Sequence, residues 1–315
     1  MLREIFRRRH RRTALPRKNA TYLIWRYVGN ASRTWKAKFA KRKYPEAKRL
    51  GVDLDKAGIL CGSSTDFLSE DGQSALAEAS GFVLGLANAA MANVKNPQTK
   101  ESKKYLVELV RGVSIHEADS PLLKVALDTK LLEIVSSYLG LWPSLYSIGA
   151  WLNYPIGEAP ISSQLWHRDP EDLKIIKVFI YLVDVDEERG PFCYIPGTQS
   201  FGERANLAPV HKDGIRITDQ EMASAIGPEN WIMCTGPVGT MILADTVGFH
   251  RGGYAKNGNR ILITFTFTSG IPLKPRKARV KEAPAWLKAP IQKAALPIAP
   301  SADSAESLAP RSQPC

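Results

Sequence analysis

The stretch WHRDPEDLKIIKVFIYLVDVD, residues 166–186, decides the fold of this chain, because it joins a His-x-Asp pair to a predicted β-strand. Residues 174–186 are rich in β-branched and aromatic residues, and Gly190 and Pro191 follow as turn residues. Side chains alternate along a strand, so one face is purely aliphatic and the other is mixed. The aliphatic face consists of Ile176, Val178, Ile180 and Leu182, and the mixed face of Lys177, Phe179, Tyr181 and Val183. We expect helices to cover the first face and the second to line a pocket.

His167 and Asp169 stand at the start of this stretch, and His250 follows 81 residues after the aspartate, a gap long enough for several strands of a barrel. Two imidazoles and one carboxylate form the facial triad that binds Fe(II) and leaves three coordination positions open. Arg260 lies 10 residues after His250, at the start of a predicted strand over residues 260–268. A guanidinium can bind a carboxylate through two hydrogen bonds. The pattern predicts an iron site with Arg260 as the anchor of a co-substrate.

A His-x-Asp pair alone is a weak signal, and the chain contains a second one at His211 and Asp213. That pair lies in a stretch of Pro, Lys, Asp and Gly that is typical of a surface turn. His10 lies inside a run of arginines and His116 precedes an acidic residue in a predicted connection, so we expect both to be solvated. Of the two pairs, only the one at His167 precedes a predicted strand of the barrel.

Further segments carry a resemblance to a known family. They are WHRDP (166–170) with its following strand, GPFCYIPGTQ (190–199), GTMILAD (239–245), His250, Arg260 and, more weakly, the helical stretch 121–140. Over about residues 50–272 the chain resembles the phytanoyl-CoA dioxygenase-like Fe(II)/2-oxoglutarate oxygenases. The resemblance implies that His167, Asp169 and His250 bind iron and that Arg260 holds the distal carboxylate of 2-oxoglutarate. It also implies hydroxylation of an organic small molecule or lipid-like substrate, with dioxygen as the second co-substrate.

Two positions depart from the family pattern. Gln199 stands where the family often has histidine, and Gly252 where some members use a serine to help hold 2-oxoglutarate. The second polar partner of 2-oxoglutarate is therefore open, and Lys177, Tyr181 or Thr264 could supply it. Plausible pocket residues, each equally compatible with ordinary core, are Trp151, Asn153, Phe179 and Trp231.

Three alternatives compete with the hydroxylase hypothesis. A halogenase of the same fold needs a small residue in place of the carboxylate ligand, which Asp169 argues against. A cupin-type isomerase or hydrolase would keep the metal ligands but would have no use for Arg260. A non-catalytic jelly-roll protein that binds through residues 1–49 would tolerate the loss of His167.

The predicted architecture is mainly β, a double-stranded β-helix (jelly-roll or cupin-like) core with a helical layer. Apolar spacing predicts helices over residues 69–94 and 121–140, the second ending at Gly140. We expect a catalytic domain over residues 50–275, preceded by a basic extension (1–49). An Ala- and Pro-rich tail (276–315) is predicted to be disordered, because it cannot bury enough apolar surface.

Charge is concentrated in the basic extension, where residues 1–49 hold 17 Lys and Arg against two acidic residues. The whole chain has a net charge of +12, so the remainder is slightly acidic. Such an extension favours an anionic membrane surface, nucleic acid or an acidic partner, and a solvated extension is an equal alternative. We expect it to be separable from the chemistry.

Cysteine usage and the absence of an apolar leader favour a cytoplasmic protein. The chain has four cysteines, widely scattered and without a Cys-x-x-Cys pair, which suits reduced thiols. An acid-poor, arginine-rich N-terminus is also compatible with a mitochondrial transit peptide. The longest uncharged stretch, residues 79–94, is too short and polar to predict a transmembrane segment.

Overall fold

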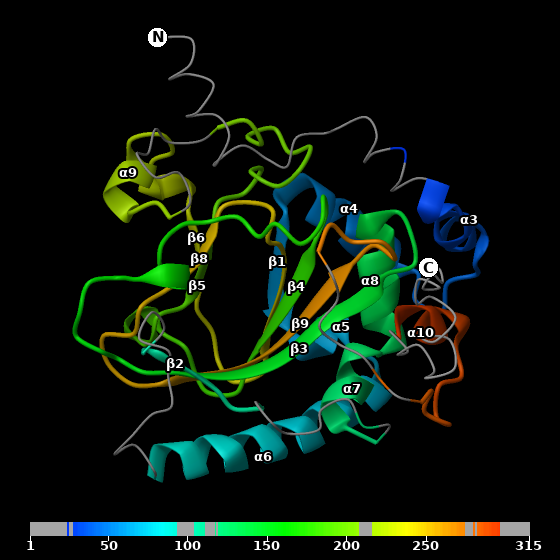
Figure 1. Cartoon of the computed structure of the whole chain (residues 1–315), viewed down its shortest axis with the longest axis horizontal. Helices are drawn as coiled ribbons and strands as arrows, with labels where there is room; N and C mark the ends of the chain where they lie inside the picture. The colour runs from blue at the N-terminus through cyan, green and yellow to red at the C-terminus, as the bar shows by residue number, and fades with distance from the viewer. Residues whose placement is uncertain are drawn as a thin grey trace, which may run out of the picture.

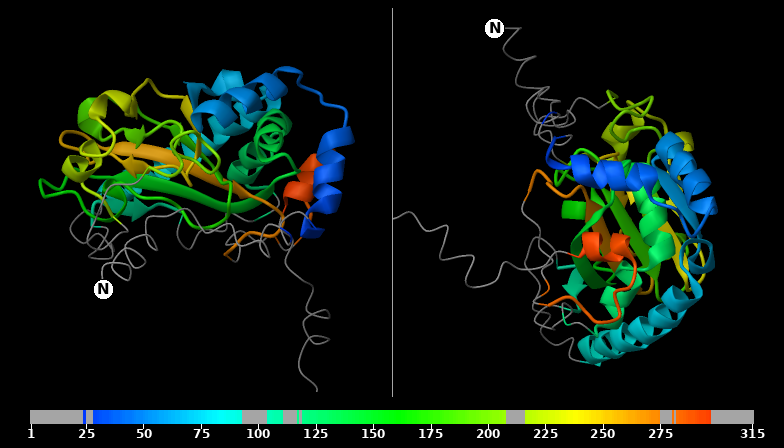
Figure 2. Two further views of the ribbon diagram at one scale, coloured as in Figure 1. Left: turned by 90° about the horizontal axis from the view of Figure 1, so that it is seen from above. Right: turned by 90° about the vertical axis from the view of Figure 1, so that its right-hand side faces the viewer.

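The computed structural model describes residues 24, 28–92, 104–110, 117, 119–207, 216–274, 280 and 282–296. Two antiparallel sheets form its core, and helices cover one side of the larger sheet (Figures 1 and 2). This arrangement is the double-stranded β-helix that the sequence predicts.

The larger sheet has six strands in the order β1-β7-β4-β9-β3-β2. Their bounds are β1 Ile59–Ser63, β7 Thr240–Asp245, β4 Ile176–Tyr181, β9 Arg260–Thr268, β3 Ser144–Asn153 and β2 Leu106–Glu108. Strand β4, which follows the His-x-Asp pair, lies between β7 and β9, and all neighbours are antiparallel. The chain order therefore crosses between non-consecutive strands, as a double-stranded β-helix requires.

The smaller sheet has three strands in the order β6-β5-β8. They are β6 (Ile232–Cys234), β5 (Phe192–Tyr194) and β8 (His250–Gly252). Two isolated bridges extend it, one between His167 and His250 and one between Trp166 and Ile217. Both predicted histidine ligands consequently lie on this sheet.

The two faces of β4 separate as the sequence predicts. Ile176, Val178, Ile180 and Leu182 belong to the main hydrophobic core, whereas Tyr181, with Phe179 and Val183 against it, belongs to a second cluster between the sheets. Lys177 points from the same face toward Asp169. Alternation along the strand thus places core packing on one side and polar chemistry on the other.

The helical layer contains both predicted helical segments. Helix α6 (Glu70–Ala92) occupies the segment predicted over residues 69–94. The segment predicted over residues 121–140 divides into α7 (Pro121–Ala126) and α8 (Thr129–Leu139). The division falls at Asp128, whose side chain accepts the N–H of Leu131 and caps α8. Gly140 ends α8 in the left-handed conformation, as predicted. Further helices are α5 (Ser64–Phe67) and α9 (Asp219–Ala223), with 3₁₀ turns at Ser162–Gln164, Glu187–Arg189 and Pro228–Asn230.

The expected boundary between residues 49 and 50 falls inside helix α4 (Glu46–Ala57), which is continuous and packs against α8. Upstream, α3 (Ala31–Phe39) buries none of its own residues, yet Arg33 donates to the carbonyls of Trp142, Pro143 and Ala294. The backbone N–H groups of Lys43 and Tyr44 bond the buried carboxylate of Glu133. The described part of the basic extension is therefore attached to the fold by polar contacts, which apolar periodicity does not reveal.

The expected disordered tail is ordered over residues 282–296. Helix α10 (Pro290–Ala295) packs against α8 and β3. The buried residues of this segment, all members of the main core, are Leu287, Ile291, Ala295 and Leu296. These few apolar side chains are enough to attach a segment whose composition is otherwise typical of disorder.

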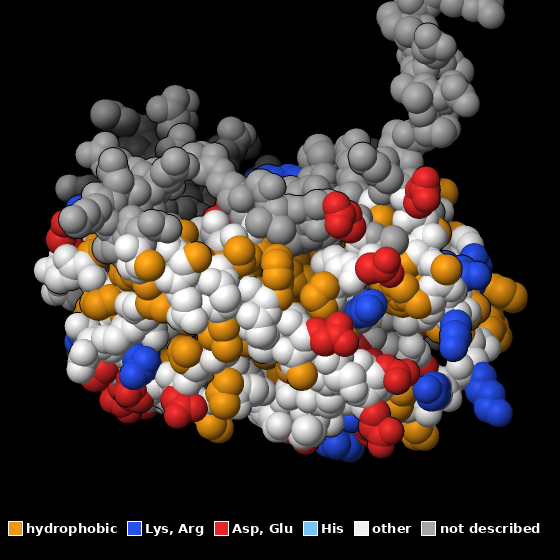
Figure 3. All heavy atoms as spheres, turned by 90° about the horizontal axis from the view of Figure 1, so that it is seen from below, with side chains coloured by type: hydrophobic (Ala, Val, Ile, Leu, Met, Phe, Trp, Pro, Cys, Tyr) orange, Lys and Arg blue, Asp and Glu red, His pale blue; other side chains and the backbone are white. Residues whose placement is uncertain are grey.

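Among the described helices, α6 is long and apolar enough by length and composition to cross a membrane. Its buried residues nevertheless form one stripe facing the core: Gly72, Ala75, Leu76, Ala79, Val83 and Ala87. Figure 3 shows the molecule from the side on which α6 lies, with apolar and uncharged surface interrupted by charged side chains. Through this stripe α6 packs on the main hydrophobic core of the protein.

Candidate metal centre

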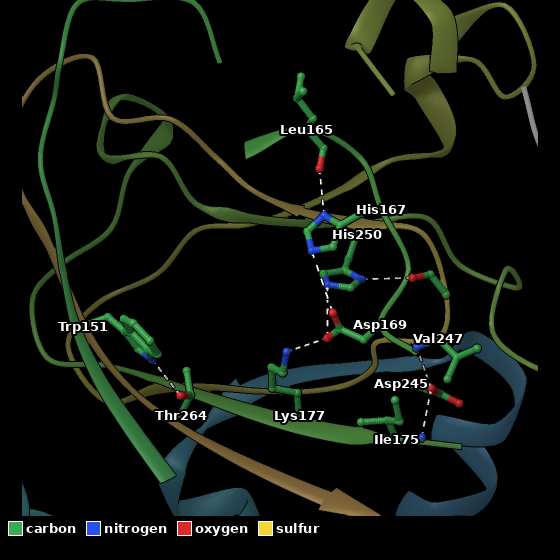
Figure 4. A network of polar contacts seen from close by, with 11 residues as sticks. Trp151, Leu165, His167, Asp169, Ile175, Lys177, Asp245, Val247, His250 and Thr264 are labelled. Carbon is green, nitrogen blue, oxygen red and sulfur yellow. Dashed lines mark hydrogen bonds and ion pairs between the residues drawn. The ribbon is translucent and has the colours of Figure 1, made fainter. Parts of the chain in front are cut away.

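Backbone pairing brings the three predicted metal ligands together. His167 and His250 exchange two backbone hydrogen bonds (2.9 and 3.1 Å), and the N–H of Asp169 donates to the carbonyl of Thr246 (2.8 Å). The donor atoms of His167, Asp169 and His250 all lie within 4.8 Å of one another. Figure 4 shows both imidazoles and the carboxylate converging on one point.

Hydrogen bonds set the tautomer of both imidazoles. Nδ1 of His167 lies 2.8 Å from the carbonyl oxygen of Leu165, and Nδ1 of His250 lies 3.0 Å from that of Gly248. A carbonyl can only accept, so each Nδ1 carries the proton and each Nε2 presents a lone pair. The Nε2 atoms lie 3.9 and 3.6 Å from the carboxylate oxygens of Asp169.

Burial prepares these groups for a cation. Desolvation, together with the neighbouring His250, lowers the pKa of His167 well below its usual value. Desolvation also lowers the pKa of His250 to about 4. Burial alone would raise the pKa of Asp169, but Lys177 and the two imidazoles hold it well below its usual range. Two neutral imidazoles and one ionised carboxylate are the donor set of the facial triad, so the residues fit divalent iron.

Lys177 supports the carboxylate ligand from strand β4. Its ammonium lies 2.5 Å from Oδ2 of Asp169. Burial lowers the pKa of Lys177, but Asp169 and Glu171 together raise it more, so the side chain remains charged. The ammonium therefore points at the metal centre and not to the rim of the barrel, the other position that the sequence allowed.

Arg260, the predicted co-substrate anchor, is buried at the start of β9. Its Nη1 donates to the carbonyl of Gly190, while its Nε has no hydrogen-bond partner among the described residues. A Cβ at Gly252 would lie 3.5 Å from Nη2, so this position, which departs from the family pattern, lies beside the guanidinium. An orphaned buried donor on a guanidinium fits a carboxylate ligand.

The other two residues predicted to hold 2-oxoglutarate already make hydrogen bonds within the protein. The hydroxyl of Tyr181 donates to the carbonyl of Cys234 and accepts the N–H of Phe192. Thr264 Oγ1 accepts the indole N–H of Trp151 at 2.9 Å. Their contact with a co-substrate stays a prediction.

The remaining pocket residues divide between site and core. Phe179 stacks near Phe192, whose ring lies 5.7 Å from that of His250, and Asn153 pairs with Arg260 across the strands. Trp231 instead packs on Trp166, within a separate cluster of hydrophobic residues. Trp231 is therefore ordinary core.

Sequence reasoning missed two groups that brace the centre. Asp245 accepts the N–H groups of Ile175 and Val247 and the hydroxyl of Tyr138, and burial raises its pKa to about 6. It thereby shapes the turn that delivers His250. Arg168, between the two ligands, points away from the triad and donates to backbone carbonyls of Thr198, Val247 and Ala205. Interior hydrogen bonding of this kind leaves no spacing signal in a sequence.

Gln199 plays no part in the centre, because its side-chain amide donates to the carbonyl of Asp55 at the end of α4. The alternative pair, His211 and Asp213, lies outside the described residues, as do His10 and His116. A cavity of about 730 Å³ lies elsewhere, lined by residues of α6, α8 and α10, and contains none of the triad.

No protein-family model matches the chain, and no curated protein matches it. Similar solved structures include the epimerase SnoN in complex with Fe³⁺, α-ketoglutarate and nogalamycin RO (12% identity, 81% of this chain and 96% of that chain, TM-score 0.49). HygX from Streptomyces hygroscopicus with nickel and 2-oxoglutarate is also similar (16% identity, 76% and 93%, TM-score 0.49), as is EctD from S. alaskensis with bound Fe (20% identity, 82% and 90%, TM-score 0.48). Such identities and TM-scores establish neither activity nor substrate for this chain.

Proposed function

We propose that this protein is an Fe(II)- and 2-oxoglutarate-dependent oxygenase that hydroxylates a small organic molecule. One observation carries this assignment: His167, Asp169 and His250 converge with both Nε2 lone pairs free and the carboxylate ionised. A similar solved structure contains Fe³⁺ and α-ketoglutarate, yet the triad of this chain alone supports the assignment.

Each residue has a separate task. Fe(II) bound at the triad would supply coordination sites for 2-oxoglutarate and dioxygen and the oxidising power for a C–H bond. Asp169 is held ionised and oriented by Lys177, while Leu165 and Gly248 orient the imidazoles. Arg260 would bind the distal carboxylate of 2-oxoglutarate, for which its unpartnered Nε is available.

The structure bears on the alternatives. Asp169 occupies the position that a halogenase leaves to a small residue, and its donor oxygens face both histidines. A metal isomerase or hydrolase would not need the buried Arg260, whose unpartnered Nε suits an anionic ligand. Both observations favour an oxygenase with a carboxylate co-substrate.

Anaerobic titration of the metal-free protein with Fe(II) and then 2-oxoglutarate tests this function. The expected result is one Fe(II) per chain and a weak visible charge-transfer band that appears only when both are present. Admission of dioxygen should then convert 2-oxoglutarate to succinate. Iron binding without the band, or without succinate, would favour the isomerase or hydrolase alternative.

A further inference from the structure

Arg216 occupies a position directly across from a metal ligand. Ile217 forms an antiparallel bridge with Trp166, and both side chains lie in one hydrophobic cluster. Because successive side chains of paired strands point to opposite faces, His167 and Arg216 point together to the other face, where the triad lies. The electrostatic influence of Arg216 on both histidines and on Asp169 agrees with this placement.

Arg216 is only partly satisfied in this position. Its Nη1 is buried and has no hydrogen-bond partner among the described residues. Burial lowers its pKa, while Asp169 and Tyr105 raise it, and a guanidinium stays charged at any physiological pH. A buried donor on a charged group is costly to leave unpaired, so a bound ligand is the natural partner.

Three other cationic side chains near the centre have an ion pair or an assigned ligand. Lys177 pairs with Asp169, and Arg260 is assigned to 2-oxoglutarate. Arg251, the residue after His250, pairs with Asp219 (3.0 Å) and lies over the ring of Trp166 on the opposite face. Among the described residues, Arg216 thus differs from these neighbours in facing the triad without an ion pair of its own.

We propose that Arg216 is a substrate-binding residue and that the substrate carries an oxyanion, a carboxylate or a phosphate, which this guanidinium receives. The inference rests on the proposed function, because it places the substrate beside the iron. A planar guanidinium whose Nη1 has no partner among the described residues suits binding of such a group. The anion would hold the adjacent carbon skeleton over the open coordination positions.

The test uses the full chain with Zn(II) in the metal site and saturating 2-oxoglutarate, so that Arg260 is occupied. The probes are small carboxylates and phosphates, each paired with its neutral amide or alcohol, observed by ligand NMR. The acids should bind and their neutral counterparts should not. Arg216→Gln should weaken acid binding by about 10-fold or more, because a charge-assisted bidentate contact is lost. Arg251→Gln, a matched loss of charge on the opposite face, should leave acid binding unchanged.

Two measurements keep the outcome decisive. Signals of 2-oxoglutarate in the same samples report the proposed function independently, so a failure of co-substrate binding is distinguishable from a failure of anion binding. If Arg216→Gln does not fold, wild-type protein loaded with Mn(II) should broaden the signals of bound acids, because they lie close to the metal. Absence of acid binding in the wild type, equal binding in folded Arg216→Gln, or bound acids without broadening would overturn the proposal.

Discussion

The two faces of the larger sheet differ in how their buried side chains are packed and hydrogen-bonded. Toward the helices, Val178, Ile263, Phe265 and Phe267 are fully buried among other apolar residues. Toward the smaller sheet, buried polar atoms such as Nε of Arg260 and Oδ1 of Asn153 have no partner among the described residues. One face is packed with apolar side chains, whereas the other presents buried polar groups that a bound ligand would satisfy.

This difference indicates that the helix-covered face stabilises the fold and that the polar face lowers its stability. An unsatisfied buried polar group costs about 1–3 kcal/mol, while a buried large apolar side chain contributes about 1.5–3 kcal/mol. The helix-covered face can therefore support a polar site that would be unstable in isolation. Changes on the two faces should separate activity from stability.

The largest expected effect on activity follows removal of a ligand. His167→Ala, Asp169→Ala and His250→Ala should each abolish iron-dependent turnover, because two ligands cannot hold Fe(II) in the facial arrangement. Equilibrium dialysis with Fe(II) and succinate formation are the measurements. His211→Ala and Asp213→Ala are the controls and should remain active. Activity in folded His250→Ala together with its loss in His211→Ala would overturn the assignment.

The largest expected effect on stability lies on the opposite face. Phe265→Ala should lower the free energy of unfolding by about 3–5 kcal/mol, because it leaves a cavity in the core. Denaturant titration measures the loss. The folded fraction at low temperature should still bind one Fe(II) per chain, and loss of metal affinity there would show that the two faces are coupled.

Arg260 tests whether the site face needs a carboxylate partner. Arg260→Gln should raise the 2-oxoglutarate requirement by roughly 30-fold or more, since breaking a desolvated charge pair costs about 2–5 kcal/mol. Fe(II) affinity should be retained. An unchanged 2-oxoglutarate requirement would leave Arg260 without a role in co-substrate binding. Lys177→Met is a companion variant. Without the ammonium, the carboxylate of Asp169 loses its ion pair, so binding of 2-oxoglutarate or of an acidic substrate should weaken.

Acidification should weaken the site face before the core. Burial lowers the pKa of His250 from 6.5 to about 4, so between these values the unfolded chain binds more protons than the folded one. The free energy of unfolding of the metal-free protein should therefore fall as pH decreases through this window. Melting curves across the window measure it, and His250→Ala should show a shallower dependence. A flat wild-type profile would contradict the buried neutral imidazole.

The smallest expected effect concerns the basic extension. Deletion of residues 1–27 should leave succinate formation and the melting temperature unchanged while reducing salt-sensitive retention on a polyanionic resin. Deletion of residues 1–49 should lower the melting temperature, because it removes α3 and cuts into α4. Equal melting temperatures for the two deletions would show that α3 and the start of α4 belong to a solvated extension, the equal alternative that the sequence left open.

Local pattern accounts for what could be predicted. The alternation of side chains in residues 174–186 predicted both faces of β4, and Gly140 predicted the residue at which α8 ends. Composition did not predict that residues 43–49 and 282–296 are attached to the core by a few apolar side chains and polar contacts. Those contacts join residues about 90 or more positions apart, and no local window contains both partners.

The sequence by itself determined the donor types, their order along the chain and the strands that carry them, because these depend on residue identity and on the two-residue period of a strand. Only the tertiary structure decided that His167 and His250 share a backbone bridge, that Lys177 reaches Asp169, and that Arg216 faces the same centre. Such proximity results from folding distant segments against one another, so it is a property of the packed chain.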